Sequence, residues 1–157
     1  MIAYDAARRM FVLKAEIWLP ARRERVFEFF SDAFQLETIT PPWLNFHVAA
    51  ERPLTITAGT KIDYKLRLHG IPIRWQSLIS VWEPPGRFVD EQLRGPYRLW
   101  HHEHRFSDQN GGTLVADEVQ YRVPGGRLIN RLFVAPDLHR TFAYRTQKLQ
   151  EIFGVSR

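Results

Sequence analysis

Two histidines placed two positions apart are the side chains of this sequence best suited to chemistry. His102 and His104 lie in segment 97–106, which alternates in the manner of a β-strand. Because successive strand side chains point to opposite faces of a sheet, both histidines share a face with Trp100 and Phe106. That face is the apolar one, so the alternation predicts that both imidazoles point toward the core.

Carboxylates on the neighbouring predicted strands come within reach of these histidines. Asp117 lies on the apolar face of segment 113–123. In segment 87–93, Asp90 and Glu91 lie on opposite faces, and a single β-bulge would exchange the two. The sequence therefore predicts an inward carboxylate at position 117 and leaves open which acid of the earlier strand points inward.

Such a cluster permits three kinds of chemistry. Two histidines and one carboxylate, from Asp117 or Asp90, match the ligand set of non-haem iron. Because no second metal-ligand spacing accompanies the His-x-His pattern, we expect no metal and no cofactor. An imidazole with a pKa near 6.5 also suits proton transfer, and His102 or His104 with Asp117 could form an enolate and expel an alcohol. The third interpretation is a hydrogen-bonded polar wall that orients a ligand.

Arg145 is a charged residue in an apolar helical stripe. The stripe consists of Leu138, Phe142, Leu149 and Phe153, at spacings typical of one helical face. A guanidinium there must pair with an acid or reach solvent along its stem. An internal ion pair is the favoured outcome, and an anionic ligand group is the alternative. The acids on the strands that the helix should cover are Asp90, Glu91, Asp117 and Glu118.

Seven segments alternate as strands do: 11–18, 44–50, 61–68, 71–82, 87–93, 97–106 and 113–123. Short turns such as Asn110-Gly111 join most of them, which favours an antiparallel meander. Helical periodicity occupies 22–30 and 33–37 after the first strand and the closing stretch to Phe153, where Pro136 divides a short helix, 127–134, from a long one. The prediction is an α+β fold with a seven-stranded curved antiparallel sheet wrapped around a long C-terminal helix.

Composition limits the remaining alternatives. The 157 residues fit one domain, 1–157, with a core at about 10–154. The charge of +5 is scattered, so we expect no nucleic-acid partner, and the absence of cysteine excludes thiol nucleophiles and zinc ribbons. No apolar run resembles a signal peptide or a membrane span, so we expect a cytoplasmic protein. No Ser–His–Asp spacing, phosphate-binding loop or nucleotide fingerprint is present.

Several motifs resemble one bacterial subgroup of the SRPBCC (START/Bet v 1-like) superfamily. They are Phe29-Phe30, Thr38-Ile39-Thr40-Pro41-Pro42-Trp43-Leu44, Asp63-Tyr64, Gly70-Ile71-Pro72, Asp90-Glu91-Gln92, Gly95-Pro96-Tyr97, Trp100-His101-His102-Glu103-His104 and Tyr144-Arg145. The resemblance implies the helix-grip fold and a cyclase/dehydrase-like or ligand-binding role. Similar domains are sometimes joined to an epimerase-like domain, which makes an epimerase-like protein a candidate partner.

The resemblance also implies a cavity between sheet and long helix that suits a small, largely apolar or amphipathic molecule. We expect these residues to line it: Tyr64, Leu66, Trp75, Asp90, Gln92, Trp100, Tyr121, Phe142 and Arg145. Ligand binding is the leading hypothesis. The first alternative is a polyketide cyclase/dehydratase-like enzyme that uses His102 or His104 with Asp117. The second is a lipid or quinone carrier that makes peripheral contact with membranes, for which the positive charge is mild support.

Overall fold

The structure, a computed structural model, describes residues 1–154, so the last three residues of the predicted domain 1–157 lie outside it. Its strands are β1 Ile2–Asp5, β2 Met10–Leu19, β3 His47–Val48, β4 Lys61–Leu68, β5 Ile71–Glu83, β6 Arg87–Arg94, β7 Leu99–Gln109 and β8 Gly112–Arg122. Its helices are α1 Arg23–Ser31, α2 Gln35–Ile39, η1 Pro42–Leu44, α3 Gly126–Ile129, η2 Asn130–Val134 and α4 Ala135–Phe153.

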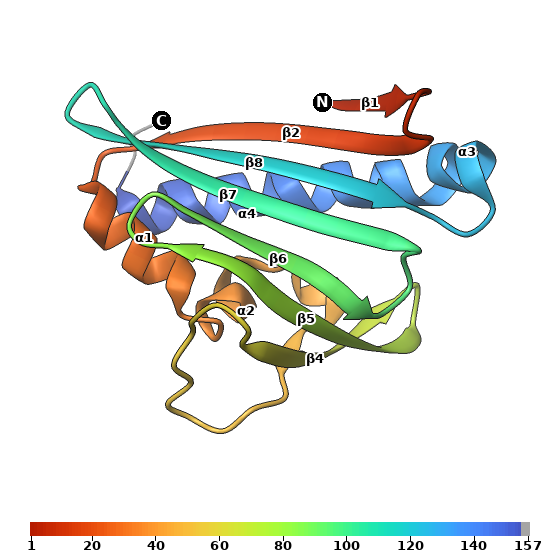
Figure 1. Cartoon of the computed structure of the whole chain (residues 1–157), viewed down its shortest axis with the longest axis horizontal. Coiled ribbons are helices and arrows are strands. Elements are labelled where there is room, and N and C mark those ends of the chain that lie inside the picture. Colours follow the sequence, from red (N-terminus) through yellow and green to blue (C-terminus); the bar gives the residue numbers. More distant parts are fainter. Residues whose placement is uncertain (155–157) are drawn as a thin grey trace.

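The described strands form one antiparallel sheet in the order β1-β2-β8-β7-β6-β5-β4-β3. Figure 1 shows α4 running along one side of this curved sheet, with α1 and α2 beside it. The predicted α+β architecture is therefore confirmed, including the two short helices after the first long strand. The predicted number of seven strands is wrong, because β1 adds an eighth strand at the sheet edge. Four residues with a mostly exposed edge give too short a pattern to predict a strand.

The closing stretch is continuously helical where the sequence predicts a division at Pro136. A short helix, α3, passes through the wide π-helical turn η2 directly into α4. Pro136 lies in the first turn of α4, directly after the π-helical bond from the Ala135 amide to the Asn130 carbonyl. Beneath the turn, the Tyr121 hydroxyl donates a hydrogen bond of 2.8 Å to Asn130 Oδ1, and both residues are buried. This bond anchors the turn to β8.

Two irregularities bend the sheet where it faces α4. The register between β5 and β6 shifts after Gln76 and again after Ile79. Such shifts increase local twist and bend a strand, which helps the sheet to curve around a helix. At one end the fold is filled by an aromatic cluster that includes Phe27, Phe88 and Phe106. The rest of the space between the concave face of the sheet and α4 contains a cavity.

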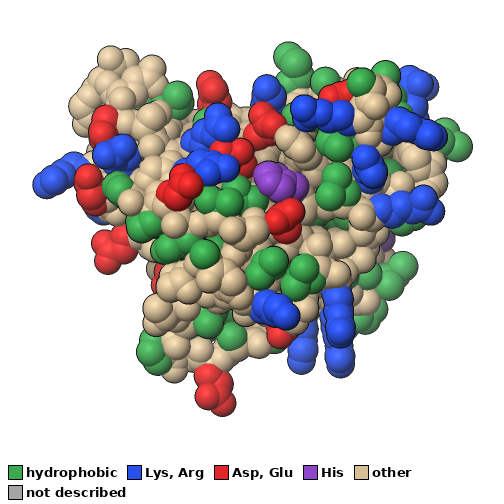
Figure 2. Space-filling view, viewed as in Figure 1, with side chains coloured by type: hydrophobic (Ala, Val, Ile, Leu, Met, Phe, Trp, Pro, Cys, Tyr) green, Lys and Arg blue, Asp and Glu red, His purple; other side chains and the backbone are tan. Residues whose placement is uncertain are grey.

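On the face drawn in Figure 2, Lys and Arg side chains occur in several places and are most numerous toward the upper right, whereas Asp and Glu side chains lie mainly toward the left. No helix of residues 1–154 combines the length and apolar character that a membrane crossing requires.

The Tyr121–Asn130 bond gives a test of how the turn is held. Replacing Tyr121→Phe leaves the buried Asn130 carbonyl without its donor, which should lower the free energy of unfolding by about 1–3 kcal/mol. Urea unfolding followed by circular dichroism measures this change. Tyr4→Phe is the control, because Tyr4 is exposed, and its loss should stay below about 0.5 kcal/mol. Equal stability of wild type and Tyr121→Phe would contradict an anchoring role.

Candidate functional site

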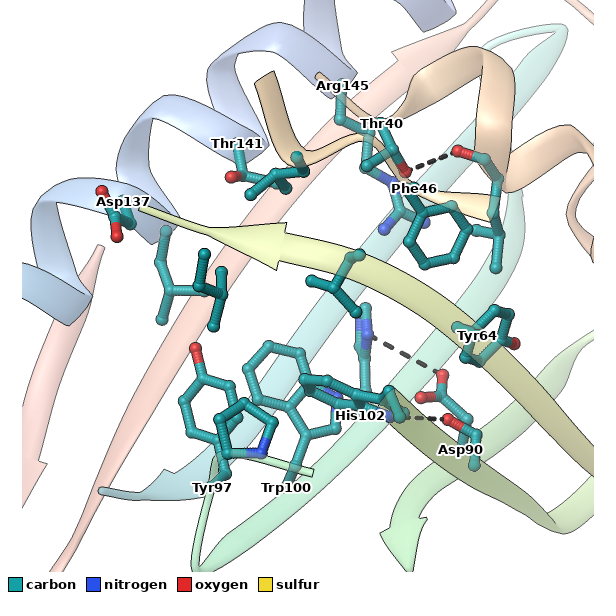
Figure 3. A pocket seen from close by; sticks show the side chains of 18 of the residues that line it. Thr40, Phe46, Tyr64, Asp90, Tyr97, Trp100, His102, Asp137, Thr141 and Arg145 are labelled. Carbon is teal, nitrogen blue, oxygen red and sulfur yellow. Dashed lines mark hydrogen bonds and ion pairs between the residues drawn. The ribbon is translucent and has the colours of Figure 1, made fainter. Parts of the chain in front are cut away.

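A cavity of about 440 Å³ lies between the sheet and α4. Most of its wall is apolar and aromatic, from residues that include Leu66, Trp75, Ile79, Tyr97, Trp100 and Leu138. Its histidine, acidic and basic side chains lie in two places, and Figure 3 labels Asp90, His102 and Arg145 of one and Asp137 of the other. One group comprises Asp90, His102, His104 and Arg145, and the other comprises His69 and Asp137. The cavity therefore has a polar group at each of two separate positions along α4.

The structure places most predicted site residues on the cavity wall. They are Tyr64, Leu66, Trp75, Asp90, Trp100, His102, His104 and Arg145. Four others lie outside the lining: Gln92, Asp117, Tyr121 and Phe142. Asp117 lies behind the histidines, and Tyr121 and Phe142 pack in an apolar cluster beside the cavity. The question of the inward acid on β6 is answered, because Asp90 lines the cavity and pairs directly with His102 in the β6–β7 register.

Gln92 has a structural task that the sequence did not indicate. Its side-chain amide donates to the Tyr97 carbonyl at 2.7 Å, and the Tyr97 amide donates to its Oε1 at 3.1 Å. These two bonds close the turn between β6 and β7. As a result, the Tyr97 ring stands on the cavity wall next to Trp75 and Trp100, with ring centroids 5.6 and 4.7 Å away.

Two histidines and two aspartates form a buried ring of alternating side chains. His102 Nε2 lies 3.0 Å from Asp117 Oδ1, and His102 Nδ1 lies 3.8 Å from Asp90 Oδ2. His104 makes the same two approaches with the opposite nitrogens, at 2.9 Å to Asp90 Oδ2 and 2.8 Å to Asp117 Oδ1. The second of these is an ion-pair distance without the alignment of a hydrogen bond. The imidazole centroids are 3.8 Å apart, so each carboxylate faces both rings.

The two histidines differ in protonation because His104 lies within 3 Å of both aspartates, whereas His102 lies 3.8 Å from Asp90. Burial lowers the pKa of His102, and the neighbouring His104 adds to this decrease more than the aspartates oppose it. Burial also acts against a charged His104, but its close contacts with Asp117 and Asp90 outweigh burial and raise its pKa. We therefore assign an imidazolium to His104. We assign to neutral His102 an Nε2–H that donates to Asp117 and a free lone pair on Nδ1, 3.8 Å from Asp90.

Both carboxylates of the ring are ionised. Burial acts to raise the pKa of Asp117, but the Arg145 guanidinium, the hydrogen bond from His102 and the close approach of His104 hold this pKa well below its usual range. Burial acts on Asp90 in the same direction, and the His104 hydrogen bond with the nearby cationic groups lowers its pKa. The charges of Asp90, Asp117, His104 and Arg145 sum to zero. The cluster is therefore electrically balanced inside the protein.

The favoured ion pair of Arg145 does not form. Within residues 1–154, none of the four candidate acids makes a hydrogen bond or ion pair with this guanidinium, and its Nε and Nη2 atoms are buried without a hydrogen-bond partner. The carbon of the guanidinium lies 5.3 Å from the Phe30 ring centroid and 5.8 Å from that of Phe142. The prediction is wrong because the aspartates of the ring direct their oxygens at the histidines.

A metal ion is one group that part of the ring could hold. Asp90, His102 and His104 each offer a ligand atom, and these atoms lie within 4.8 Å of one another. This is the two-histidine, one-carboxylate set, with Asp117 placed to orient both imidazoles from behind. However, the ring is already neutralised by His104 and Arg145, and the Arg145 charge opposes an added cation. The absence of a metal stays a prediction.

Sequence reasoning missed several residues of the wall. Ser77 shares strand parity with Trp75 and Ile79, so the alternation of β5 could have indicated it; its hydroxyl accepts a hydrogen bond of 3.0 Å from Trp75 Nε1. Tyr97 precedes β7, where strand parity does not apply, and only the Gln92 contact sets its direction. His69 and Asp137 come from distant parts of the chain, and no sequence signal joins them.

Solved structures share this fold. A protein of Thermus thermophilus is 22% identical, with a TM-score of 0.68 over 92% of this chain and 99% of that chain. The major latex-like protein 151 of Panax ginseng, a Bet v 1-like protein, is 10% identical, with a TM-score of 0.65 over 90% of this chain and 96% of that chain. No protein-family model matches the sequence, and no curated protein gives a significant match.

A longer protein contains a similar region. The nucleoside-diphosphate sugar epimerase of Corynebacterium glutamicum is 26% identical, with a TM-score of 0.64 over 88% of this chain and 28% of that chain. Together with the helix-grip architecture, these likenesses show that the chain has the Bet v 1-like fold.

The ring predicts different protonation of its two histidines. At about pH 7, His104 should carry protons on both nitrogens and His102 on Nε2 alone. Stability supplied by the His104 charge is complete below about pH 6.5 and is lost as the pH rises through its raised pKa. Nitrogen-15 NMR of the imidazoles, with the urea-unfolded chain as the reference, measures both states. The assignment would be contradicted if His102 and His104 titrated together, both with a pKa near that of histidine in the unfolded chain.

Proposed function

We propose that this protein binds a small, largely apolar molecule in the cavity between the sheet and α4. The observation that carries the proposal is a largely apolar cavity of about 440 Å³ whose wall includes a compact group of polar side chains, Asp90, His102, His104 and Arg145. Small-molecule sites in proteins typically measure about 300–1,000 Å³ and combine apolar walls with a few convergent polar groups. The cavity has both properties.

The aromatic part of the wall supports binding without large rearrangement. Trp75, Tyr97 and Trp100 contact one another edge to face or tilted, with centroids 4.7–5.6 Å apart. Such contacts fix the rings relative to one another. A preformed wall lowers the entropic cost of binding, because few protein side chains have to be ordered when the ligand enters. Flat or elongated apolar molecules fit this wall best.

A bulkier side chain that fills the cavity should weaken ligand binding. Leu66 points into the cavity from β4, whereas Lys65, next to it, is exposed on the other face. Leu66→Trp should therefore weaken binding of the neutral fluorescent probe N-phenyl-1-naphthylamine by about tenfold or more, and Lys65→Trp should not. Fluorescence titration measures both affinities, with circular dichroism to verify folding. Lack of saturable binding by the wild type, or equal losses in the two variants, would refute the proposal.

A second candidate function is acid–base catalysis on a ligand in the same cavity. The observation that favours it is the 3.8 Å separation of two cavity imidazoles whose surroundings shift their pKa values in opposite directions, up for His104 as a proton donor and down for His102 as an acceptor. The free lone pair on His102 Nδ1 lies on the Asp90 side of the ring, and Asp90 lines the cavity. This pair is suited to enolisation of a carbonyl compound, the step that cyclase/dehydratase chemistry requires.

Enolisation can be tested without the natural substrate. The wild type should accelerate exchange of the acidic methylene hydrogens of 1-(2-naphthyl)butane-1,3-dione with deuterated water, as followed by proton NMR. His102→Asn should lower this rate by about a hundredfold, because it removes the base, while leaving probe binding intact. His101→Asn, on the opposite face of β7, is the matched control. Exchange at the buffer rate in the presence of bound diketone would exclude this second function.

A further inference from the structure

Arg145 is a half-buried cation, and two of its donor atoms are buried without a hydrogen-bond partner in the described part of the chain. It projects from α4 and lines the cavity, while its Nε and Nη2 atoms are buried and make no hydrogen bond (Figure 3). A buried donor left without an acceptor is destabilising, and more so when it is charged. Native proteins rarely tolerate such groups unless they serve a purpose. The guanidinium therefore has unused capacity to bind an acceptor.

The neighbouring carboxylates do not use this capacity. Asp117 Oδ1 faces both histidines, and Asp90 Oδ2 accepts a hydrogen bond from His104. The Arg145 charge lowers the pKa of both acids, so it acts on them through space. The charge of Arg145 is thus compensated by the two aspartates, whereas its Nε and Nη2 donors have no acceptor. What the guanidinium lacks is an oxygen acceptor that reaches it directly.

Two aromatic rings hold the guanidinium in place. Its central carbon lies 5.3 Å from the Phe30 centroid and 5.8 Å from the Phe142 centroid, distances at which a cation is attracted to a ring. A guanidinium fixed in this way has lost much of its rotamer freedom before a ligand arrives. Its planar fork matches the two oxygens of a carboxylate, and such paired, charge-assisted bonds are about twice as strong as neutral ones.

We propose that Arg145 binds the carboxylate of an amphipathic ligand whose apolar body lies along α4. This inference rests on the proposed ligand-binding function and specifies the class of molecule: a carboxylic acid with a compact apolar or aromatic body. Trp100 and Leu138 belong to the wall that such a body would contact.

The other polar group of the cavity fixes the ligand direction. Asp137 and Arg145 lie on the same helix, about 12 Å apart along its axis. Asp137 Oδ2 lies 2.7 Å from His69 Nε2, so that end of the cavity presents a carboxylate in contact with an imidazole, whereas the other end presents the unpaired donors of Arg145. A ligand carboxylate would be repelled by Asp137 and attracted by Arg145. The acid end therefore points toward the ring of histidines and aspartates.

A matched pair of probes tests this assignment. 1-Naphthaleneacetate and 1-naphthaleneacetamide have nearly the same shape, but only the first is an anion. Both are titrated by isothermal titration calorimetry into wild type, Arg145→Gln, Arg145→Lys and Arg140→Gln. Arg140 is the control, because it is exposed on the same helix, with its guanidinium carbon 4.7 Å from the centroid of the Trp43 ring.

The expected pattern is specific to the charge. Wild type and Arg140→Gln should bind the acetate about tenfold or more tightly than the amide, Arg145→Lys should keep part of this preference, and Arg145→Gln should lose it. Amide affinity should change less than about threefold in Arg145→Gln, which also verifies an intact cavity. Equal affinity of wild type for both probes, or a preference that survives in Arg145→Gln, overturns the carboxylate assignment alone. If the wild type binds neither probe nor N-phenyl-1-naphthylamine, the proposed function itself fails.

Discussion

The charge on Asp117 is the constraint on which the rest of the site depends. Only 7% of this residue is exposed, and an ionised carboxylate at such a depth is stable only with cations or donors around it. His102 and His104, themselves 5% and 3% exposed, supply those contacts from β7, and Arg145 supplies charge from α4. Removing Asp90, Asp117, His104 or Arg145 would leave another charge of the cluster uncompensated, and removing His102 would take away a hydrogen-bond donor of Asp117. The ring therefore behaves as one unit, and its geometry fixes the polar end of the cavity.

The curved sheet makes this unit possible because adjacent strands carry its members. Asp90 pairs with His102 across β6 and β7, and His104 pairs with Asp117 across β7 and β8, so the antiparallel register alone brings the four side chains together. The bends in β5 then carry the sheet around α4. The fold thus separates two tasks: strand pairing assembles the charges, and curvature creates the apolar volume next to them.

Local patterns in the sequence predicted those parts of the site that follow from strand parity. The inward direction of His102, His104 and Asp117 depends only on alternation within regular strands, and the structure agrees. Parity could not decide between Asp90 and Glu91, because irregular pairing with β5 lies beside them. The partner of Arg145 was mispredicted for a different reason. The sequence could indicate that Asp90 and Asp117 lie near Arg145. It could not indicate that their oxygens contact the histidines instead, because that depends on distances that no sequence pattern contains.

The ring is better explained by a ligand than by stability. Buried ion pairs seldom stabilise a fold more than well-packed apolar side chains of similar volume would. An apolar cluster with Phe27, Phe88 and Phe106 already borders His104, so continued apolar packing at these positions would serve the fold as well. Apolar side chains, however, cannot distinguish one end of a bound molecule from the other. A fixed set of charges at one end of an apolar cavity can do so, and in the proposed binding mode the unused donors of Arg145 would direct that preference toward an acidic group.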